Sequence, residues 1–388
     1  MSIFEKENKK KAIAVLEIAS DSVGGIIFLQ DKEGKPEIVS TVRIPINFLF
    51  DVDFEAFWRC SKDALIKVIK KMLKDYPRGP DTCLCVLLSP WFLSETKIIS
   101  IQKKEPFRIT KEFFKELLKE EDSNLKKKWN LNEKLSENAP VIIENEVMRT
   151  ELNGYPVDSV FGKKARTVKA HIYASLGMKK IVKEVEKKVL ENFGDIPLSF
   201  RTMPAVLFKV LRSVINTSDG FITVDIGGEI TDIIVVKNDS LEEVASFPIG
   251  RNSLIKKISS KFNTFPKEAS SLLRAYFNDH LSKENKLKMF EILKEAEIEW
   301  CDFFKKAVRQ ISKGNALPQD VFLIGDETFS GQLLKCTENE NFSGLTILGK
   351  PFIVKRISTN GFSHYFDFKG KIEDVFLLAE SLLANKIL

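Results

Sequence analysis

Two segments of the chain share a pattern of strand, tight turn and strand, and this repeat constrains the fold more than any other feature. The later segment, residues 221–236, reads FITVDIGGEITDIIVV, and the earlier one, residues 14–29, reads AVLEIASDSVGGIIFL. Each joins two apolar runs through a turn of small and acidic residues, which is the pattern of a β-hairpin. The repeat therefore predicts a duplicated α/β fold with one hairpin in each half.

The turn residues of the later hairpin indicate what such a pair could bind. The backbone N–H groups of Gly227 and Gly228 can approach phosphate oxygens because no side chain stands in the way. The carboxylate of Asp225, just before the turn, can hold a magnesium-bound water. Two such hairpins facing each other across a cleft would form a phosphate clamp.

Composition limits the classes of protein to which the chain can belong. The chain has 388 residues, of which 44% are hydrophobic and 29% charged, enough for two or more subdomains of an ordinary globular protein. Its net charge of +6 is small, with 60 basic and 54 acidic residues. Most lysines alternate with glutamates, as on solvated helix faces, so we expect no nucleic-acid partner.

The cysteines, histidines and apolar runs exclude several kinds of site. No cysteine pair has metal-ligand spacing, so all five are expected to be buried free thiols in a reducing compartment: Cys60, Cys83, Cys85, Cys301 and Cys336. The three histidines form no cluster, so no triad or zinc site is predicted. The longest apolar stretch, LCVLLSPWFL, is about half a membrane span. We therefore expect a cytoplasmic protein with no direct membrane insertion, whose contact with a membrane is made through a partner.

Local patterns predict the order of the elements. An antiparallel meander of three strands is expected first, followed by a helix over 54–74 and a buried strand. The residue pattern changes at residue 91. Residues 91–178 are predicted to form a strand, a helix and two further strands, with a turn at Asn153-Gly154. Further helices are predicted at 179–194, 266–278, 283–312 and 370–388.

These patterns divide the chain into three predicted parts. The first lobe comprises residues 1–88 with 179–217 and the C-terminal helix 371–388. An inserted small α+β subdomain covers 89–178. The second lobe covers 218–370 and includes a helical subdomain at about 251–317.

Four motifs, spread over nearly the whole chain, resemble the actin-like ATPase superfamily, and within it the FtsA/PilM type. VDIGGEITDIIVV resembles its second phosphate motif, and FPIGRNSLIKKIS is similar to the segment that follows. VFLIGDETFSGQL resembles the adenosine motif, with Gly325 and Gly331 in place. The block ending MRTELNGYPVDSVFGKKARTVKAHIYAS resembles the small subdomain of FtsA and PilM. The resemblance implies an α/β, actin-like (ribonuclease H-like, duplicated) two-lobed fold.

The resemblance also implies ATP or ADP with Mg²⁺ as cofactor. Asp225 and Glu17 would hold the metal through water, and no catalytic residue is nominated. The implied nucleotide-binding residues are Asp225, Gly227, Gly228, Thr231, Ser20, Ser22, Gly250, Arg274 and Gly325.

Several positions depart from the family pattern. The first phosphate motif usually reads Asp-Ile-Gly, whereas this chain has Glu17-Ile18-Ala19. The second glycine of the adenosine motif is Asp326, and an Ala-Glu pair before a lysine is replaced by Ser270-Ser271 before Arg274. Nucleotide binding is therefore expected to be weak or vestigial.

On this resemblance we expect an actin-like scaffold or adaptor that links a protein partner or polymer to a membrane-associated division or pilus machine. The 89–178 subdomain would bind the partner, and self-association is also an expectation. The alternative is an active ATPase or a sugar-type kinase of the same superfamily. A kinase needs a carboxylate base between the lobes, and none could be nominated. Whether the machine serves division or a pilus stays open.

Overall fold

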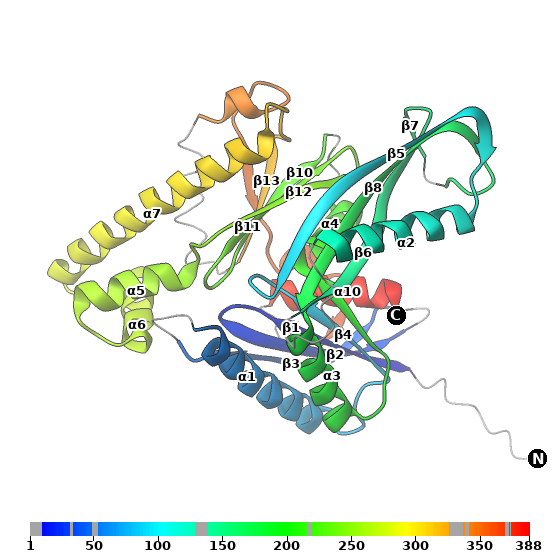
Figure 1. Ribbon diagram of the computed structural model, residues 1–388. Coiled ribbons are helices and arrows are strands. Elements are labelled where there is room, and N and C mark those ends of the chain that lie inside the picture. Colours follow the sequence, from blue (N-terminus) through cyan, green and yellow to red (C-terminus); the bar gives the residue numbers. More distant parts are fainter. Residues whose placement is uncertain are drawn as a thin grey trace, which may run out of the picture.

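Three β-sheets and the helices that cover them make up the described part of the protein, in a computed structural model (Figure 1). The structure describes residues 10–31, 34–48, 53–128, 139–157, 159–215, 217, 219–325, 337, 341–368, 372 and 374–388.

The first sheet has six strands in the order β15-β3-β2-β1-β4-β9. The first three strands form the predicted antiparallel meander, and β4 and β9 extend the sheet in parallel. The strands are β1 (Lys11–Ile18), β2 (Ser22–Gln30), β3 (Glu37–Pro45), β4 (Thr82–Leu87), β9 (Leu198–Thr202) and β15 (Asp367–Phe368).

Helices cover both faces of this sheet, which is why its central strands are apolar throughout. Alternate residues of a strand point to opposite faces. Ala14 and Leu16 of β1 pack with α1 (Phe54–Asp75) and α3 (Lys179–Phe193), whereas Ile13 and Val15 pack with α4 (Met203–Val214) and α10 (Val375–Ile387). Figure 1 shows α1 and α3 on one side of the sheet and α4 and α10 on the other.

The second sheet has five strands in the order β12-β11-β10-β13-β14. Its centre repeats the first sheet, because β10 pairs antiparallel with β11 and parallel with β13, as β1 does with β2 and β4. The elements are β10 (Phe221–Ile226), β11 (Thr231–Lys237), β12 (Ser240–Phe247), α5 (Arg251–Phe262), α6 (Pro266–Phe277), α7 (Lys283–Ser312), β13 (Asp320–Gly325), η1 (Ser343–Leu345) and β14 (Ile353–Arg356). The short helix α9 (Asn360–Ser363) follows β14 and packs against α10.

A third sheet, in the order β5-β8-β6-β7, stands beside the other two (Figure 1). Its elements follow the predicted order of strand, helix, strand and strand. Asn153 and Gly154 have φ of 51° and 87°, the left-handed conformation that a tight hairpin turn requires. The elements are β5 (Phe92–Arg108), α2 (Lys111–Lys128), β6 (Pro140–Leu152), β7 (Tyr155–Pro156) and β8 (Lys164–Met178).

The boundaries of the three predicted parts remain a proposal, with one difference at the C-terminal end. β15 pairs with β3 in the first sheet, although its residues lie inside the range predicted for the second lobe. A two-residue strand carries no periodicity, so the sequence could not reveal this pairing.

The thiols differ in part from the expectation. Cys60, Cys83 and Cys85 are free, and burial raises the pKa of the Cys83 and Cys85 thiols, which keeps them protonated. Cys301 is disulfide-bonded, so the prediction of a free thiol is wrong there. Spacing gave no signal for this bond, because no other cysteine lies near Cys301 in the sequence.

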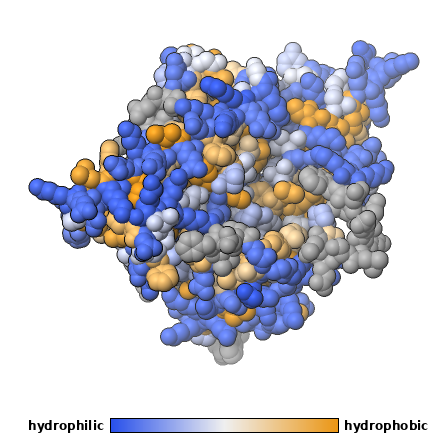
Figure 2. All heavy atoms as spheres, turned by 60° about the vertical axis from the view of Figure 1, so that its left-hand side comes forward, coloured by the Kyte–Doolittle hydropathy of each residue, from blue (hydrophilic) through white to orange (hydrophobic). Residues whose placement is uncertain are grey.

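The described helices include none that is both long and apolar enough to cross a membrane. Figure 2 shows a mostly hydrophilic face with separate hydrophobic patches. Large apolar side chains are exposed on the outer side of α7, among them Leu287, Phe290 and Ile298.

The packing of β2 against α1 gives a first prediction. A Cβ atom on Gly25 would lie 2.4 Å from Met72 Sδ and 2.5 Å from Val68 Cγ1. Gly25→Ala should therefore lower the free energy of unfolding by about 1–3 kcal/mol, measured by urea denaturation. Gly344→Ala is the control, because no atom lies within 4 Å of its added Cβ. Equal stability of the two variants would contradict this account of the core.

Candidate functional site

The turns of the two repeated hairpins meet directly between the first two sheets. A Cβ on Gly228 would lie 2.4 Å from Asp21 Cβ, so only glycine allows the β10–β11 turn to approach the β1–β2 turn so closely. The Glu229 N–H donates to Ser20 Oγ at 3.0 Å across this junction, and Gly227 N–H donates to Ile230 O within its own turn. The Gly227 N–H, one of the two predicted phosphate donors, thus donates within the chain itself.

The start of α5 closes on the same junction. The backbone N–H groups of Arg251 and Asn252 donate to the carbonyls of Gly227 and Gly228, at 3.0 and 2.7 Å. Gly250 packs against these carbonyls, because a Cβ there would lie 2.5 Å from each oxygen. Only glycine fits at position 250 in this geometry, and the predicted role of Gly250 in nucleotide binding stays a prediction.

Arg43 on β3 binds the acid that had been predicted to hold a metal. Its Nη1 and Nη2 donate to the two carboxylate oxygens of Glu17 at 2.7 and 2.8 Å. Its Nε and Nη2 donate to Asp374 at 2.6 and 3.0 Å, and Nη1 also reaches Ser22 Oγ at 2.9 Å. Such paired two-point contacts are strong and geometrically specific. The proposed magnesium-water role of Glu17 does not fit this geometry, because both of its oxygens are engaged by Arg43.

A second buried acid accompanies Glu17. Glu380 of α10 is fully buried, and burial, followed by the charge of Glu17, raises its pKa well above the ordinary value. Burial also raises the pKa of Glu17, against the opposing effect of Arg43. The carboxyl group of Glu17 is therefore part of a buried, paired cluster and is not a free carboxylate.

Asp225 is the residue of the predicted phosphate clamp that has a buried oxygen without a hydrogen-bond partner. It is only 3% exposed, and its Oδ1 has no hydrogen-bond partner. Burial raises its pKa well above the usual value, and the charges of Asp232, Glu17 and Asp21 raise it further. Asp232, its cross-strand neighbour, has a pKa raised by burial to about 6 and accepts hydrogen bonds from Ser89 and Ser246.

The other predicted site residues fall into two groups. Thr231 is buried, donates to Ile249 O at 2.6 Å and accepts from Trp300 Nε1 at 3.1 Å, so its contacts are those of the core. Arg274 is exposed on α6 and contacts Ser271. Gly325, like Ser22, lines the cavity beside the junction. Gly331 and Asp326 lie outside the described residues.

This cavity has a volume of about 360 Å³, at the lower end of the range for small-molecule sites. Its charged lining includes Glu17, Asp21, Arg43, Asp225, Arg251 and Asp374. Asp225 suits a cation, but Glu17 is paired and Asp21 brings a third acid. The described residues therefore do not fit a magnesium nucleotide in this geometry.

Sequence reasoning missed four members of this cluster: Asp21, Arg43, Arg251 and Asp374. Arg43 carried one usable signal, because it is the single basic residue in the apolar-alternating run PEIVSTVRIPI. Its partners could not be inferred, since Glu17 and Asp374 are separated by more than 350 residues.

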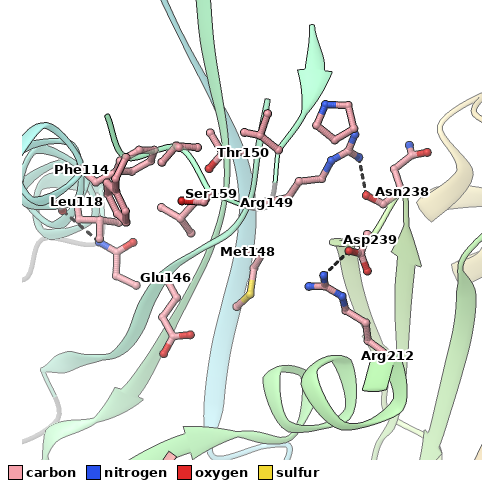
Figure 3. A pocket seen from close by; sticks show the side chains of 16 residues that line it. Phe114, Leu118, Glu146, Met148, Arg149, Thr150, Ser159, Arg212, Asn238 and Asp239 are labelled. Atoms are coloured by element: carbon pink, nitrogen blue, oxygen red, sulfur yellow. Dashed lines mark hydrogen bonds and ion pairs between the residues drawn. The ribbon is translucent and has the colours of Figure 1, made fainter. Parts of the chain in front are cut away.

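A much larger cavity lies on the small subdomain. It has a volume of about 1140 Å³ and is bounded by β6, α2, the segment after β7, the end of α4 and the β11–β12 turn (Figure 3). We call it the β6 groove. Its lining residues are Phe114, Leu118, Asn145, Glu146, Val147, Met148, Arg149, Thr150, Pro156, Val157, Ser159, Val160, Phe161, Arg212, Asn238 and Asp239.

The β6 groove runs along an open strand edge. β6 pairs with β8 on one side, and among the described strands only β7 pairs with the other side, at Glu151 and Leu152. Two polar contacts join the walls at one end, where Arg149 Nη1 donates to Asn238 O at 2.6 Å and Arg212 pairs with Asp239 (Figure 3).

A buried glutamate fixes the base of β6 to the first lobe. Glu144 Oε2 accepts from Thr202 N–H at 3.0 Å, Thr202 Oγ1 at 2.5 Å and Ser175 Oγ at 3.1 Å. Its Oε1 has no hydrogen-bond partner. Burial raises the pKa of Glu144 to about 7, although the contact with Thr202 opposes the shift.

No family model matches the chain, and no curated protein matches it significantly. Among solved structures, the PilM-PilN type IV pilus biogenesis complex aligns with a TM-score of 0.64 and 14% identity, over 95% of this chain and 94% of that one. This likeness shows the fold: the chain has the actin-like fold of the PilM type, as predicted.

Two other solved structures are more distant. A Bacteroides thetaiotaomicron protein with an actin-like ATPase fold and unknown function has a TM-score of 0.40 and 10% identity, over 98% of each chain. The ethanolamine utilization protein EutJ from Carboxydothermus hydrogenoformans has a TM-score of 0.39 and 12% identity, over 88% of this chain and 84% of that one. Neither adds to the conclusion about the fold.

The burial of Glu144 predicts a dependence of stability on pH. Because its folded-state pKa of about 7 lies above the ordinary value of 4.5, the stabilising contribution is complete below about pH 4.5 and is lost as pH rises through 7. Glu144→Gln keeps an acceptor but cannot titrate. From pH 5 to 8 it should gain about 2–3 kcal/mol in unfolding free energy relative to wild type, measured in urea.

Glu146→Gln is the control for this measurement. Glu146 lies two residues further along β6, is half-buried and pairs with Lys209 and Arg201. If Glu144→Gln and Glu146→Gln change with pH in the same way, the raised pKa of Glu144 is not the cause.

Proposed function

We propose that the protein is an adaptor of the PilM type that holds an extended segment of a protein partner in the β6 groove, and that nucleotide binding is weak or vestigial. The partner would belong to a membrane-associated pilus-assembly or division machine, and the contact with that machine would keep the protein in the cytoplasm close to the membrane. The PilM-PilN complex supports the choice of a protein ligand, since that solved relative of the fold is itself a complex.

The open edge of β6 is the observation that carries this proposal. An unpaired strand edge presents backbone N–H and C=O groups in a row, and an extended peptide can add to it as a further strand. The apolar side chains of Phe114, Leu118 and Val157 line the same groove and would give the peptide's side chains pockets. Both the backbone and the side-chain parts of strand addition are thus available in one cavity.

The cleft gives less support to the enzymatic alternative. An ATPase or kinase requires a carboxylate aimed at an attacking water or hydroxyl. Glu17 is paired with Arg43, Asp21 with Arg251 and Asp232 with two serines. Asp374 is also paired with Arg43, which leaves Asp225 among the described acids of the cavity, and its raised pKa favours a protonated carboxyl that is a poor base. Turnover of ATP or phosphorylation of a small metabolite by the purified protein would contradict the adaptor proposal.

A pull-down tests the groove. Wild-type protein first identifies the partner, and the double variant Val157→Glu with Phe161→Ala is then compared with it. Phe161 is 50% exposed, so the fold should tolerate the change, while a charge and a lost ring should reduce capture at least tenfold. Tyr155→Ala is the matched control, because Tyr155 is 74% exposed on β7 but does not line the groove. Equal capture by all three proteins would place the partner elsewhere.

Thermal unfolding tests the nucleotide part separately. With millimolar affinity, 1 mM ATP and Mg²⁺ should raise the melting temperature by only about 1 °C, because stabilisation by mass action is then small. An increase of many degrees in wild type would show tight binding and overturn this part of the proposal.

A further inference from the structure

The outer face of α7 carries an exposed row of residues with the spacing of a helix–helix contact. Four residues recur at intervals of four, three and four positions, which places them on one face of the helix: Leu287, Glu291, Lys294 and Ile298. Phe290 lies beside them. Leu287 is 67% exposed, and Phe290 and Ile298 are each 55% exposed. We call these five residues the α7 stripe.

The core of the second lobe does not use the α7 stripe. The stripe ends after Ile298, because Cys301 at the next turn is buried. The side chains of α7 that fill the core lie on the opposite side of the helix, among them Met289, Leu293, Ala296 and Trp300. A surface helix needs only one apolar face to pack on its own domain. α7 therefore has a second set of large apolar side chains, which stays exposed in the described part of the chain.

The α7 stripe is complementary to itself in an antiparallel arrangement. When two copies of α7 run side by side in opposite directions, with a two-fold axis between residues 292 and 293, Leu287 of each copy meets Ile298 of the other. The same register places Glu291 opposite Lys294, and symmetry makes this contact twice. Sliding one helix by two turns would instead oppose Leu287 to Glu291 or Ile298 to Lys294. One register therefore matches both the apolar and the charged positions.

The two charged residues of the α7 stripe are available for such contacts. Glu291 and Lys294 are exposed, and neither has a hydrogen-bond or ion-pair partner among the residues that the structure describes. Glu299 lies to the side of the stripe and pairs instead with Lys257 of α5 at 2.8 Å. The unpaired charges are thus those that an antiparallel second copy would face.

Beyond the proposed docking of a partner in the β6 groove, we propose that the α7 stripe is the contact surface of a homodimer, in which a second copy of this chain packs its own α7 antiparallel against it. The charge pattern selects the second copy, because each half of the stripe is the complement of the other half. A contact of about three helical turns is smaller than the roughly 1,200 Å² of stable complexes, so the dissociation constant should be roughly 10–100 μM.

Such a dimer would keep the β6 groove accessible. Figure 1 shows α7 on one side of the second sheet and the third sheet, which carries the groove, on the other. Two grooves in one dimer would bind a partner that is present in several copies more tightly than one groove can, because the second contact is then intramolecular.

Sedimentation equilibrium of the full chain tests the dimer. Wild type between about 5 and 500 μM should change from one chain to two. Glu291→Lys and Lys294→Glu should each raise the dissociation constant at least about tenfold, because each variant places like charges opposite each other at two symmetric positions. Leu287→Glu should remain a monomer throughout. The fold should tolerate all three changes, since these side chains are exposed.

Rescue of the charge variants tests the register. An equal mixture of Glu291→Lys and Lys294→Glu should form a mixed dimer at least as stable as that of wild type, and the double variant should dimerise as wild type does. Glu116→Lys changes an exposed acid on α2 and is the control, which should leave the dissociation constant unchanged.

Three results would overturn the proposal: wild type that stays a monomer over the whole range, charge variants that dimerise like wild type, or single variants that neither the mixture nor the double variant rescues. Partner capture is not a readout here, so failure of the dimer cannot be confused with failure of the groove.

Discussion

The burial of charge between the first sheet and the C-terminal helix is the constraint on which the rest of the site depends. Glu17, Asp374 and Glu380 come together where β1, β3 and the start of α10 meet, and uncompensated buried carboxylates are very costly. Arg43 pairs with two of them and offsets one negative charge, and the raised pKa of Glu380 favours the neutral form of the third. With this cluster in place, Ser22 and Asp21 are held at the edge of the cleft.

The turns of the duplicated hairpins have a geometry that suits either anion binding or direct contact with each other. In both sheets an antiparallel hairpin lies beside a parallel strand, so the two turns face each other between the lobes. Such turns are suited to an anion, yet here Ser20 and Asp21 of one turn bond to Glu229 and Arg251 across the junction. This contact between the turns requires a glycine at position 228.

The two cavities differ in what they offer a ligand. The cleft is small and its charged groups are mostly engaged with one another, which favours a fixed arrangement of the lobes. The β6 groove is about three times larger, mixes apolar and polar side chains, and runs along an unpaired strand edge. An adaptor needs such an accessible surface more than it needs a reactive centre, and this contrast underlies the proposed function.

The sequence by itself determined the duplicated hairpins, the inserted block and most helices, because periodicity and turn residues are local signals. Gly227 and Gly228 marked the later turn correctly, and the run FEAFWRCSKDALIKVIKKMLK gave α1 to within one residue.

Only the tertiary structure decided what the site residues do. Glu17 was predicted as a metal-water ligand, but its partner Arg43 lies on another strand, and Asp374 lies at the far end of the chain. Thr231 and Gly250 matched a binding motif, and only the fold showed that Thr231 hydrogen-bonds to Ile249 O and that Gly250 lies against the Gly227 and Gly228 carbonyls. Side-chain pairing across such distances leaves no local pattern, because it is fixed by the packing of whole elements.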